Sequence, residues 1–275
     1  MDTDLIMLRV AAVFYLAATV AALAGVAGRH ALSGRLLRWL LGLGLAAHVA
    51  ALGLRATALG GMPAASLGES LSILAVLLVG LFLLAQLRAP LVALGAVVSP
   101  LAFGLAFAAM ALKGAVQPLP PVLHSVWFPL HVGISLLGDA VFALAFSASV
   151  LYLIQERRLK AHRGRGMLGH LPSLETLDRV SHTCLVWGLV LLTFGVMSGI
   201  VWAHVVWSDR PWMGDPKILF TLLVWVLYVV LLQGRMTAGW RGRWAAQLTI
   251  AGFMVIVMSL VGVNVLGLGI HSKAY

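Results

Sequence analysis

Long apolar stretches alternate with short polar stretches along the whole chain. Eight of the apolar stretches are close to the ~20 residues that a helix needs to cross a bilayer. They are Leu5–Ala27, Leu36–Leu59, Leu71–Leu87, Leu91–Leu112, Trp127–Ile154, Cys184–Val206, Ile218–Leu232 and Trp244–Leu268. The pattern predicts an all-α, polytopic membrane protein with about eight transmembrane helices. We expect residues 1–275 to form a single integral-membrane domain.

The composition supports this prediction. Hydrophobic residues make up 61% of the chain, charged residues 10%, and the mean hydropathy is +1.02. Soluble domains do not have this balance. The net charge of +10 would indicate nucleic acid in a soluble protein, but here the basic residues lie in short loops between apolar stretches. Membrane topology and the lipid bilayer explain them better, and we expect no nucleic-acid partner.

The cysteine content and the charges before the first apolar stretch exclude three further features: a disulfide, a multi-cysteine metal motif and a cleaved signal peptide. A single cysteine, Cys184, rules out an internal disulfide and any CxxC metal motif. The acidic residues Asp2 and Asp4, rather than basic ones, precede the first apolar stretch. That stretch is therefore predicted to be a retained span and not a cleaved signal peptide.

The loop charges predict the orientation. Thirteen of the nineteen cations follow the odd-numbered spans: Arg29, Arg35, Arg38, Arg88, Arg157, Arg158, Lys160, Arg163, Arg165, Arg179, Arg235, Arg241 and Arg243. The positive-inside rule makes this side cytoplasmic. Both termini are then predicted to lie outside, on the periplasmic side, together with the loops at 62–70, 113–125 and 207–217.

The longest predicted loop, Gln155–Ser181, is basic and lies on the cytoplasmic side. Its second half places Leu171, Leu174, Leu177 and Val180 on one helical face. This pattern predicts a short amphipathic helix on the membrane surface. A solvated linker is the alternative.

One outer segment, Trp202–Lys217, combines aromatic and polar residues between two apolar stretches. Its sequence, WAHVVWSDRPWMGDPK, contains Trp202, Trp207 and Trp212, followed by Asp215. Three tryptophans in so short a segment indicate a flat aromatic shelf for a planar ligand. The alternative is an aromatic belt at the membrane interface, followed by a turn.

Several histidines are predicted at the same outer level as this segment. They are His124, His131, His204 and His271. Imidazole is a common ligand of haem iron, and two opposed imidazoles would hold the iron from both faces. Cationic partners for the haem propionates could come from three residues. They are Arg210, Lys217 and Arg55. Alternatively, each outer histidine is an interfacial side chain bonded to backbone.

Three polar residues within or next to the spans need partners of their own. His48, in the middle of the second span, either forms a hydrogen bond between helices or is a second, membrane-embedded haem ligand. Asp139 in the fifth span should face a polar pocket. Glu69 fits the first turn of the third helix, where its charge meets the positive end of the helix dipole.

Several motifs, taken together, resemble a haem-handling membrane family of cytochrome c biogenesis. That family includes the synthase component CcsA and the related HemX-type proteins. The matching stretches are LGESL (Leu67–Leu71), WFPLHV (Trp127–Val132), GIVWAHVVW (Gly199–Trp207), DPK (Asp215–Lys217), AGWRGRWAA (Ala238–Ala246) and GVNVLGLGIHS (Gly262–Ser272). The similarity is strongest over about residues 60–273. It implies a multi-pass protein of the bacterial inner membrane.

The resemblance implies specific roles for these residues. His131 and His271 match the two external haem-ligand histidines, and Trp207, Trp212 and Asp215 fall in the family's tryptophan-rich haem platform. The expected cofactor is haem b, held at the outer face. The expected partners are a CcsB-like membrane protein with a large external domain and an apocytochrome c, whose thiols receive the haem vinyl groups. The chain would be part of a haem ligation system and not an enzyme alone.

The chain also departs from the family pattern. The segment usually close to WGxYWxWDPKE becomes WSDRPWMGDPKI, with Gly214 and Ile218 at positions of Trp and Glu, and Gln233 replaces the family's seventh-span histidine. These departures keep a HemX-type accessory role open, with a haem-biosynthesis enzyme as the cytoplasmic partner. A transporter or channel unrelated to haem, using Asp139 and His48 as pathway residues, is the remaining alternative.

Overall fold

The computed structural model describes residues 3–26, 34–88, 91–114, 121–161, 172–207 and 212–269. Within these ranges, eight helices are long and apolar enough to cross a membrane. The helices are α1 (Thr3–Val26), α2 (Gly34–Leu59), α3 (Leu67–Arg88), α4 (Gly95–Ala111), α5 (Trp127–Lys160), α6 (Leu174–Val206), α7 (Pro216–Thr237) and α8 (Arg243–Val257); a π turn (Met258–Gly262) and the short α9 (Val263–Val265) extend α8. The predicted all-α architecture with eight spans is confirmed.

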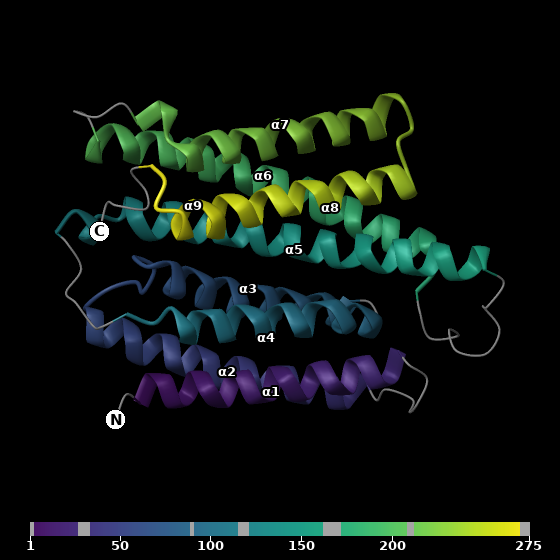
Figure 1. Cartoon of the computed structure of the whole chain (residues 1–275), viewed down its shortest axis with the longest axis horizontal. Coiled ribbons are helices and arrows are strands. Elements are labelled where there is room, and N and C mark those ends of the chain that lie inside the picture. Colours follow the sequence, from purple (N-terminus) through teal and green to yellow (C-terminus); the bar gives the residue numbers. More distant parts are fainter. Residues whose placement is uncertain are drawn as a thin grey trace.

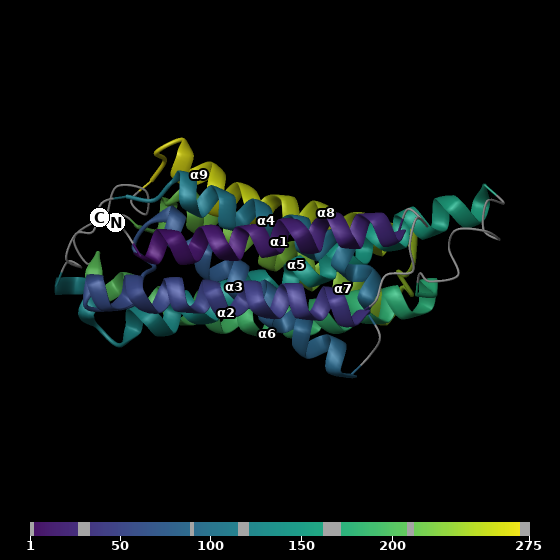
Figure 2. The same cartoon turned by 90° about the horizontal axis from the view of Figure 1, so that it is seen from below.

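The helices form two groups that run along a common axis (Figure 1). Helices α1 to α4 make one group, and α6, α7 and α8 lie on the other side of α5. Helix α5 packs against α6 and α8 on one side and α3 on the other, and its spanning window is 67% buried against 22–44% for the others. The start of α1 and the end of α9 lie at the same end of the bundle, as the turned view also shows (Figure 2). We call this the N-terminal end.

A single stripe of buried residues holds α2 in the first group. These residues recur at intervals of three or four, as on one face of a helix: Leu37, Leu41, Gly44, His48, Ala51, Arg55 and Leu59. Gly44 lets α1 approach closely, because a Cβ atom there would lie 2.7 Å from the Tyr15 ring. Small residues at such crossings allow membrane helices to gain dispersion contacts that lipid would otherwise supply.

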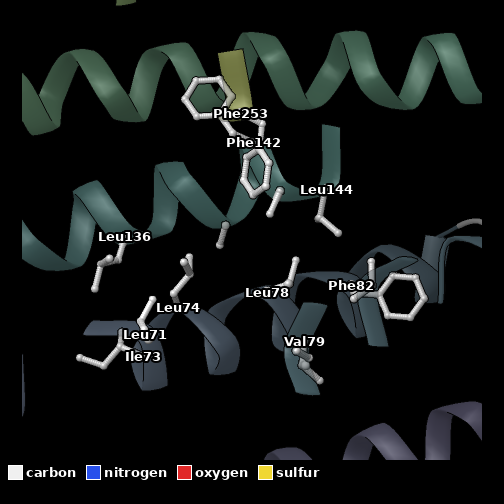
Figure 3. Packing of buried hydrophobic residues seen from close by; sticks show 14 of the residues in the cluster. Leu71, Ile73, Leu74, Leu78, Val79, Phe82, Leu136, Phe142, Leu144 and Phe253 are labelled. Carbon is white, nitrogen blue, oxygen red and sulfur yellow. The ribbon is translucent and has the colours of Figure 1, made fainter. Parts of the chain in front are cut away.

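The second group is built on close contact between α5 and α6. A Cβ atom at Gly188 of α6 would lie 2.6 Å from the Phe142 ring of α5, and Phe142 stacks on Tyr228 of α7 at 4.4 Å. Figure 3 shows Phe142 directed toward Phe253 of α8, while Leu144 lies on the side of α5 that faces α3. Helix α5 therefore joins the two groups through one continuous apolar core.

The structure corrects the boundaries of the basic loop. Helix α5 continues to Lys160, and α6 already begins at Leu174, so much of the predicted loop Gln155–Ser181 is helical. The separate surface helix was wrong: Ser173 caps α6 by accepting a hydrogen bond from Thr176 N, and Leu177 is buried in the core. Since no glycine or proline follows until the bilayer span, this turn simply continues into α6.

Candidate functional site

His131 projects from the second turn of α5 at the N-terminal end of the bundle. Its Nδ1 lies 3.0 Å from the Gly195 carbonyl oxygen and 3.3 Å from Ser198 Oγ on α6. A carbonyl oxygen can only accept, so this hydrogen bond places the imidazole proton on Nδ1. Nε2 is then the nitrogen that carries a lone pair, as a metal-ligating histidine requires.

Two glycines of α6 allow α5 to approach closely, and one of them makes room for the His131 ring. A Cβ atom at Gly199 would lie 2.7 Å from His131 Cε1, and one at Gly195 would lie 2.9 Å from Ser135 Oγ. Gly195 and Gly199 are four residues apart and therefore share one face of α6. The sequence interpretation missed these residues, although the Gly-x-x-x-Gly spacing in an apolar helix is a recognised sign of close helix packing.

The three tryptophans of the outer segment are buried rather than half exposed. Trp202 packs against Phe128 of α5, with ring centroids 5.7 Å apart, and belongs to the main core. Trp207 and Trp212 form a separate apolar cluster with Ala203. The structure thus brings all three to the end of the bundle that carries His131, as a packed wall between α5, α6 and α7.

Asp215 begins α7 and is buried. Its Oδ1 accepts a hydrogen bond from Lys217 N at 3.0 Å, and Pro216 occupies the first helical turn, both typical of a helix N-terminus. Gly269, near the end of the described chain, has a positive φ of 79° and packs directly against the Asp215 carboxylate. The C-terminal segment therefore approaches α7 two residues before His271.

The other outer candidates divide into three sets. His124 and His204 lie at the same end as His131; both are exposed, and His204 meets the Trp212 ring edge-on at 5.0 Å. His271 and Arg210 lie outside the described residues. Lys217, in the first turn of α7, interacts electrostatically with Asp139 of α5 and with Asp215. Lys217 is thus a cation whose charge acts on Asp139 from within the bundle, and the sequence did not identify this relation.

His48 lies in the other helix group, away from the tryptophan wall. It is fully buried, its Nε2 is hydrogen-bonded to Ser72 Oγ of α3 at 2.8 Å, and its Nδ1 lies 3.4 Å from the Tyr15 hydroxyl of α1. Both ring nitrogens are therefore engaged by neighbouring helices. This geometry favours the helix–helix hydrogen bond among the two alternatives considered for His48.

Arg55 is also part of the first group. Its Nε donates to Glu69 Oε1 at 3.0 Å, and its Nη2 donates to the Gly114 carbonyl at 3.2 Å. Glu69 lies in the first turn of α3, as predicted, and its Oε2 accepts hydrogen bonds from Ala65 N and Ser66 N. The pairing of Arg55 with Glu69 joins α2 to α3 at the same level as the outer site.

Comparison with known proteins agrees with these motifs. Residues 64–271 match the family model described as cytochrome C assembly protein. Proteins named cytochrome c biogenesis protein CcsA are similar over most of their length: 33% identity in Thermosynechococcus vestitus (78% of this chain, 80% of that protein), 33% in Synechococcus sp. WH7803 (86% and 85%) and 32% in Guillardia theta (82% and 80%).

These matches do not favour the HemX-type alternative, because the relatives carry the CcsA name. They also agree with the eight membrane-crossing helices and with a role in cytochrome c maturation that involves haem. The chain belongs to the CcsA-type family of multi-pass cytochrome c assembly proteins.

Proposed function

We propose that this protein is the haem-binding component of a cytochrome c biogenesis system. His131 and His271 would hold haem b at the outer face through their imidazole nitrogens. Trp202, Trp207, Trp212 and Asp215 form the surrounding wall. The chain supplies position, and haem supplies the iron and the vinyl groups that react with apocytochrome thiols.

The geometry of His131 carries the proposal. Its Nδ1–H is bonded to the Gly195 carbonyl, and the ring is held between α5 and α6 against Gly199. Histidines that ligate metals usually donate their other ring N–H to a carbonyl or carboxylate, which fixes both the tautomer and the ring orientation. His131 has this second partner before any ligand binds.

The residue types at this end of the bundle suit a planar apolar ligand with acidic groups. Trp207 and Trp212 contribute large, rigid aromatic side chains that pack with Ala203, one turn along α6 from Gly199. Lys217 lies in the first turn of α7, two residues after Asp215, and we assign it to a propionate. The contact between Gly269 and Asp215 supports a position for His271 near the same wall.

The outward orientation rests on the loop charges. Thirteen cations follow the odd-numbered spans, so the end with His131 and the tryptophan wall is assigned to the periplasmic side of a bacterial inner membrane. We expect a CcsB-like membrane partner and an apocytochrome c to meet the protein there. Thioether formation is then a property of the assembled system and not of this chain alone.

An absorption spectrum of the purified protein tests the proposal. Wild-type protein should show a Soret band with bis-imidazole features in both oxidation states. His131→Gly and His271→Gly should each lower haem affinity by about 100-fold, the upper end of effects seen when metal sites lose supporting groups. Added imidazole should restore the band in each glycine variant, because it can occupy the vacated ligand position.

His204→Gly is the matched control. His204 lies at the same end of the bundle but is exposed and packs edge-on against Trp212. Its replacement should leave the Soret band and its position unchanged. Normal haem occupancy in the double variant His131→Gly/His271→Gly would refute the assigned ligands.

A further inference from the structure

A cavity lies in the first helix group, between the ends of α1, α2, α3 and α4. Its empty space, including the part that is open to the surroundings, amounts to about 410 Å³, and we call it the α1–α4 cavity. Its lining comes from the first two turns of α1 and α3, the C-terminal parts of α2 and α4, and the residues that adjoin α3 and α4. Those residues are Asp4, Leu5, Leu8, Ala51, Leu52, Arg55, Ser66, Gly68, Glu69, Ser72, Ala109, Lys113 and Gly114. The outer haem site uses none of them.

Two ion pairs surround the polar part of this cavity. Arg55 Nε and Glu69 Oε1 are 3.0 Å apart, and Lys113 Nζ and Asp4 Oδ1 are 2.9 Å apart. All four side chains are largely buried. Two cations are thus matched by two carboxylates, and a ligand needs no net charge to balance the site.

In the Arg55–Glu69 pair, both carboxylate oxygens have hydrogen-bond partners, but one guanidinium nitrogen has none in the described part of the chain. Both Glu69 oxygens accept hydrogen bonds, Oε1 from Arg55 and Oε2 from two backbone N–H groups. Arg55 is only 7% exposed and donates through Nε and Nη2, yet Nη1 is buried and has no partner in the described part of the chain. A buried guanidinium donor without an acceptor is costly, by about 1–3 kcal/mol or more.

The deeper part of the cavity is mainly apolar. Leu8, Ala51 and Ala109 line it. Ser72 also reaches it, but its hydroxyl is already bonded to His48 Nε2. The cavity therefore combines one unpaired donor near the helix ends with an apolar floor about one helical turn farther in.

We propose that the α1–α4 cavity binds the ester region of a membrane acyl lipid. A lipid carbonyl oxygen accepts a hydrogen bond from Arg55 Nη1, and the adjoining methylenes lie against Leu8, Ala51 and Ala109. A neutral oxygen acceptor on an apolar chain satisfies the unpaired donor without upsetting the balanced charges. The ends of membrane-crossing helices lie at the interfacial level of the bilayer, where such ester groups are found.

Lipid binding to the purified full-length protein tests this inference. The probes are dioleoyl phosphatidylethanolamine and its dialkyl ether analogue, which has the same headgroup but lacks the carbonyl oxygens. Native mass spectrometry in detergent should give an affinity for the diacyl lipid about tenfold above that for the ether lipid, the value expected for one hydrogen bond to a charged donor.

Two neighbouring alanines give a matched pair of variants. Ala51→Leu fills the cavity floor without touching either ion pair, and it should abolish the preference for the diacyl lipid. Ala50→Leu, whose site is exposed on the outer side of α2, should retain it. Equal affinity of the two lipids for wild-type protein, or an unchanged preference in Ala51→Leu, would overturn the proposal.

A double variant tests the donor itself. Arg55→Met/Glu69→Gln removes both charges of the pair together, so that neither is left buried alone. The preference for the diacyl lipid should disappear, while the haem spectrum of the outer site stays normal. An unchanged helical circular dichroism spectrum serves as the measure of correct folding, and because it does not require bound haem, it keeps this test separate from the haem proposal.

Discussion

His48 and His131 show how one residue type serves two different purposes in the two helix groups. His48 is fully buried, and side chains from α1 and α3 engage both of its nitrogens. His131 lies near a helix end, and a backbone carbonyl fixes its proton on Nδ1. The hydrogen-bond partners of the two ring nitrogens therefore distinguish a structural histidine from a candidate ligand better than depth in the membrane does.

The same contrast extends to the charged residues. In the first group, the Arg55–Glu69 pair joins α2 to α3 and is shielded from water. In the second group, Asp215 caps α7 and meets the C-terminal segment at Gly269. Mutations at the buried pair of the first group are therefore expected to affect mainly stability, whereas in the second group the mutations around His131 are expected to affect haem binding.

The largest effect should come from breaking the buried ion pair. Glu69→Ala leaves the Arg55 guanidinium without its counter-ion and should lower the free energy of unfolding by about 3–5 kcal/mol. Unfolding by SDS in mixed micelles, monitored by tryptophan fluorescence, measures this change in the free energy of unfolding. Glu175→Ala is the control, because the Glu175–Arg179 pair is exposed and should contribute less than about 1 kcal/mol. Similar losses in both variants would contradict this distinction.

The next largest effect is expected for Gly199→Ala, on haem affinity. The added methyl group would displace the His131 ring, and haem affinity should fall by about tenfold. Haem titration of the apoprotein measures this change. Gly80→Ala, at a helical position with open space around it, should leave haem affinity unchanged. Unaltered binding in Gly199→Ala would mean that the position of the His131 ring is unimportant.

Replacing His48 should affect stability but not haem. His48→Leu leaves Ser72 and Tyr15 without their shared partner and should lower the free energy of unfolding by about 1–2 kcal/mol. The Soret band should keep its intensity. Loss of all haem in this variant would revive the membrane-embedded ligand and a haem route through the first helix group.

The smallest expected effect concerns the helix cap. Asp215→Ala removes the acceptor for Lys217 N and should lower the free energy of unfolding by about 1 kcal/mol. Asp215→Asn retains a capping oxygen and should be close to wild type in stability. A loss of haem binding in both variants would show that the charge of Asp215, and not its cap, serves the site.

Much of the fold followed from local sequence. All eight spans were predicted, because a window of about 20 apolar residues has few alternatives to a membrane helix. The surface helix at Leu171–Val180 was the error. Its amphipathic pattern was read correctly as helical, but the pattern could not show that the helix continues into α6 with Leu177 in the core.

The candidate site was only partly visible in the sequence. His131, the tryptophans and Asp215 could be singled out by residue type, by the level assigned to each span and by the family motifs. Gly195 and Gly199 were missed because their role depends on which residue of α5 crosses them. The tryptophans were expected to form a flat aromatic shelf or an interfacial belt, and the sequence could not show that packing against Phe128 and Ala203 buries them.

The sequence by itself determined that the protein crosses the membrane eight times, since hydropathy acts within each span independently of its neighbours. It also determined the cytochrome c assembly family, through motifs spread from Leu67 to Ser272. Only the tertiary structure decided that His48 bonds to Tyr15 and Ser72, that His131 bonds to Gly195, and that Arg55 keeps one donor unpaired. These contacts join residues far apart in the chain, and the packing of helices against one another sets them.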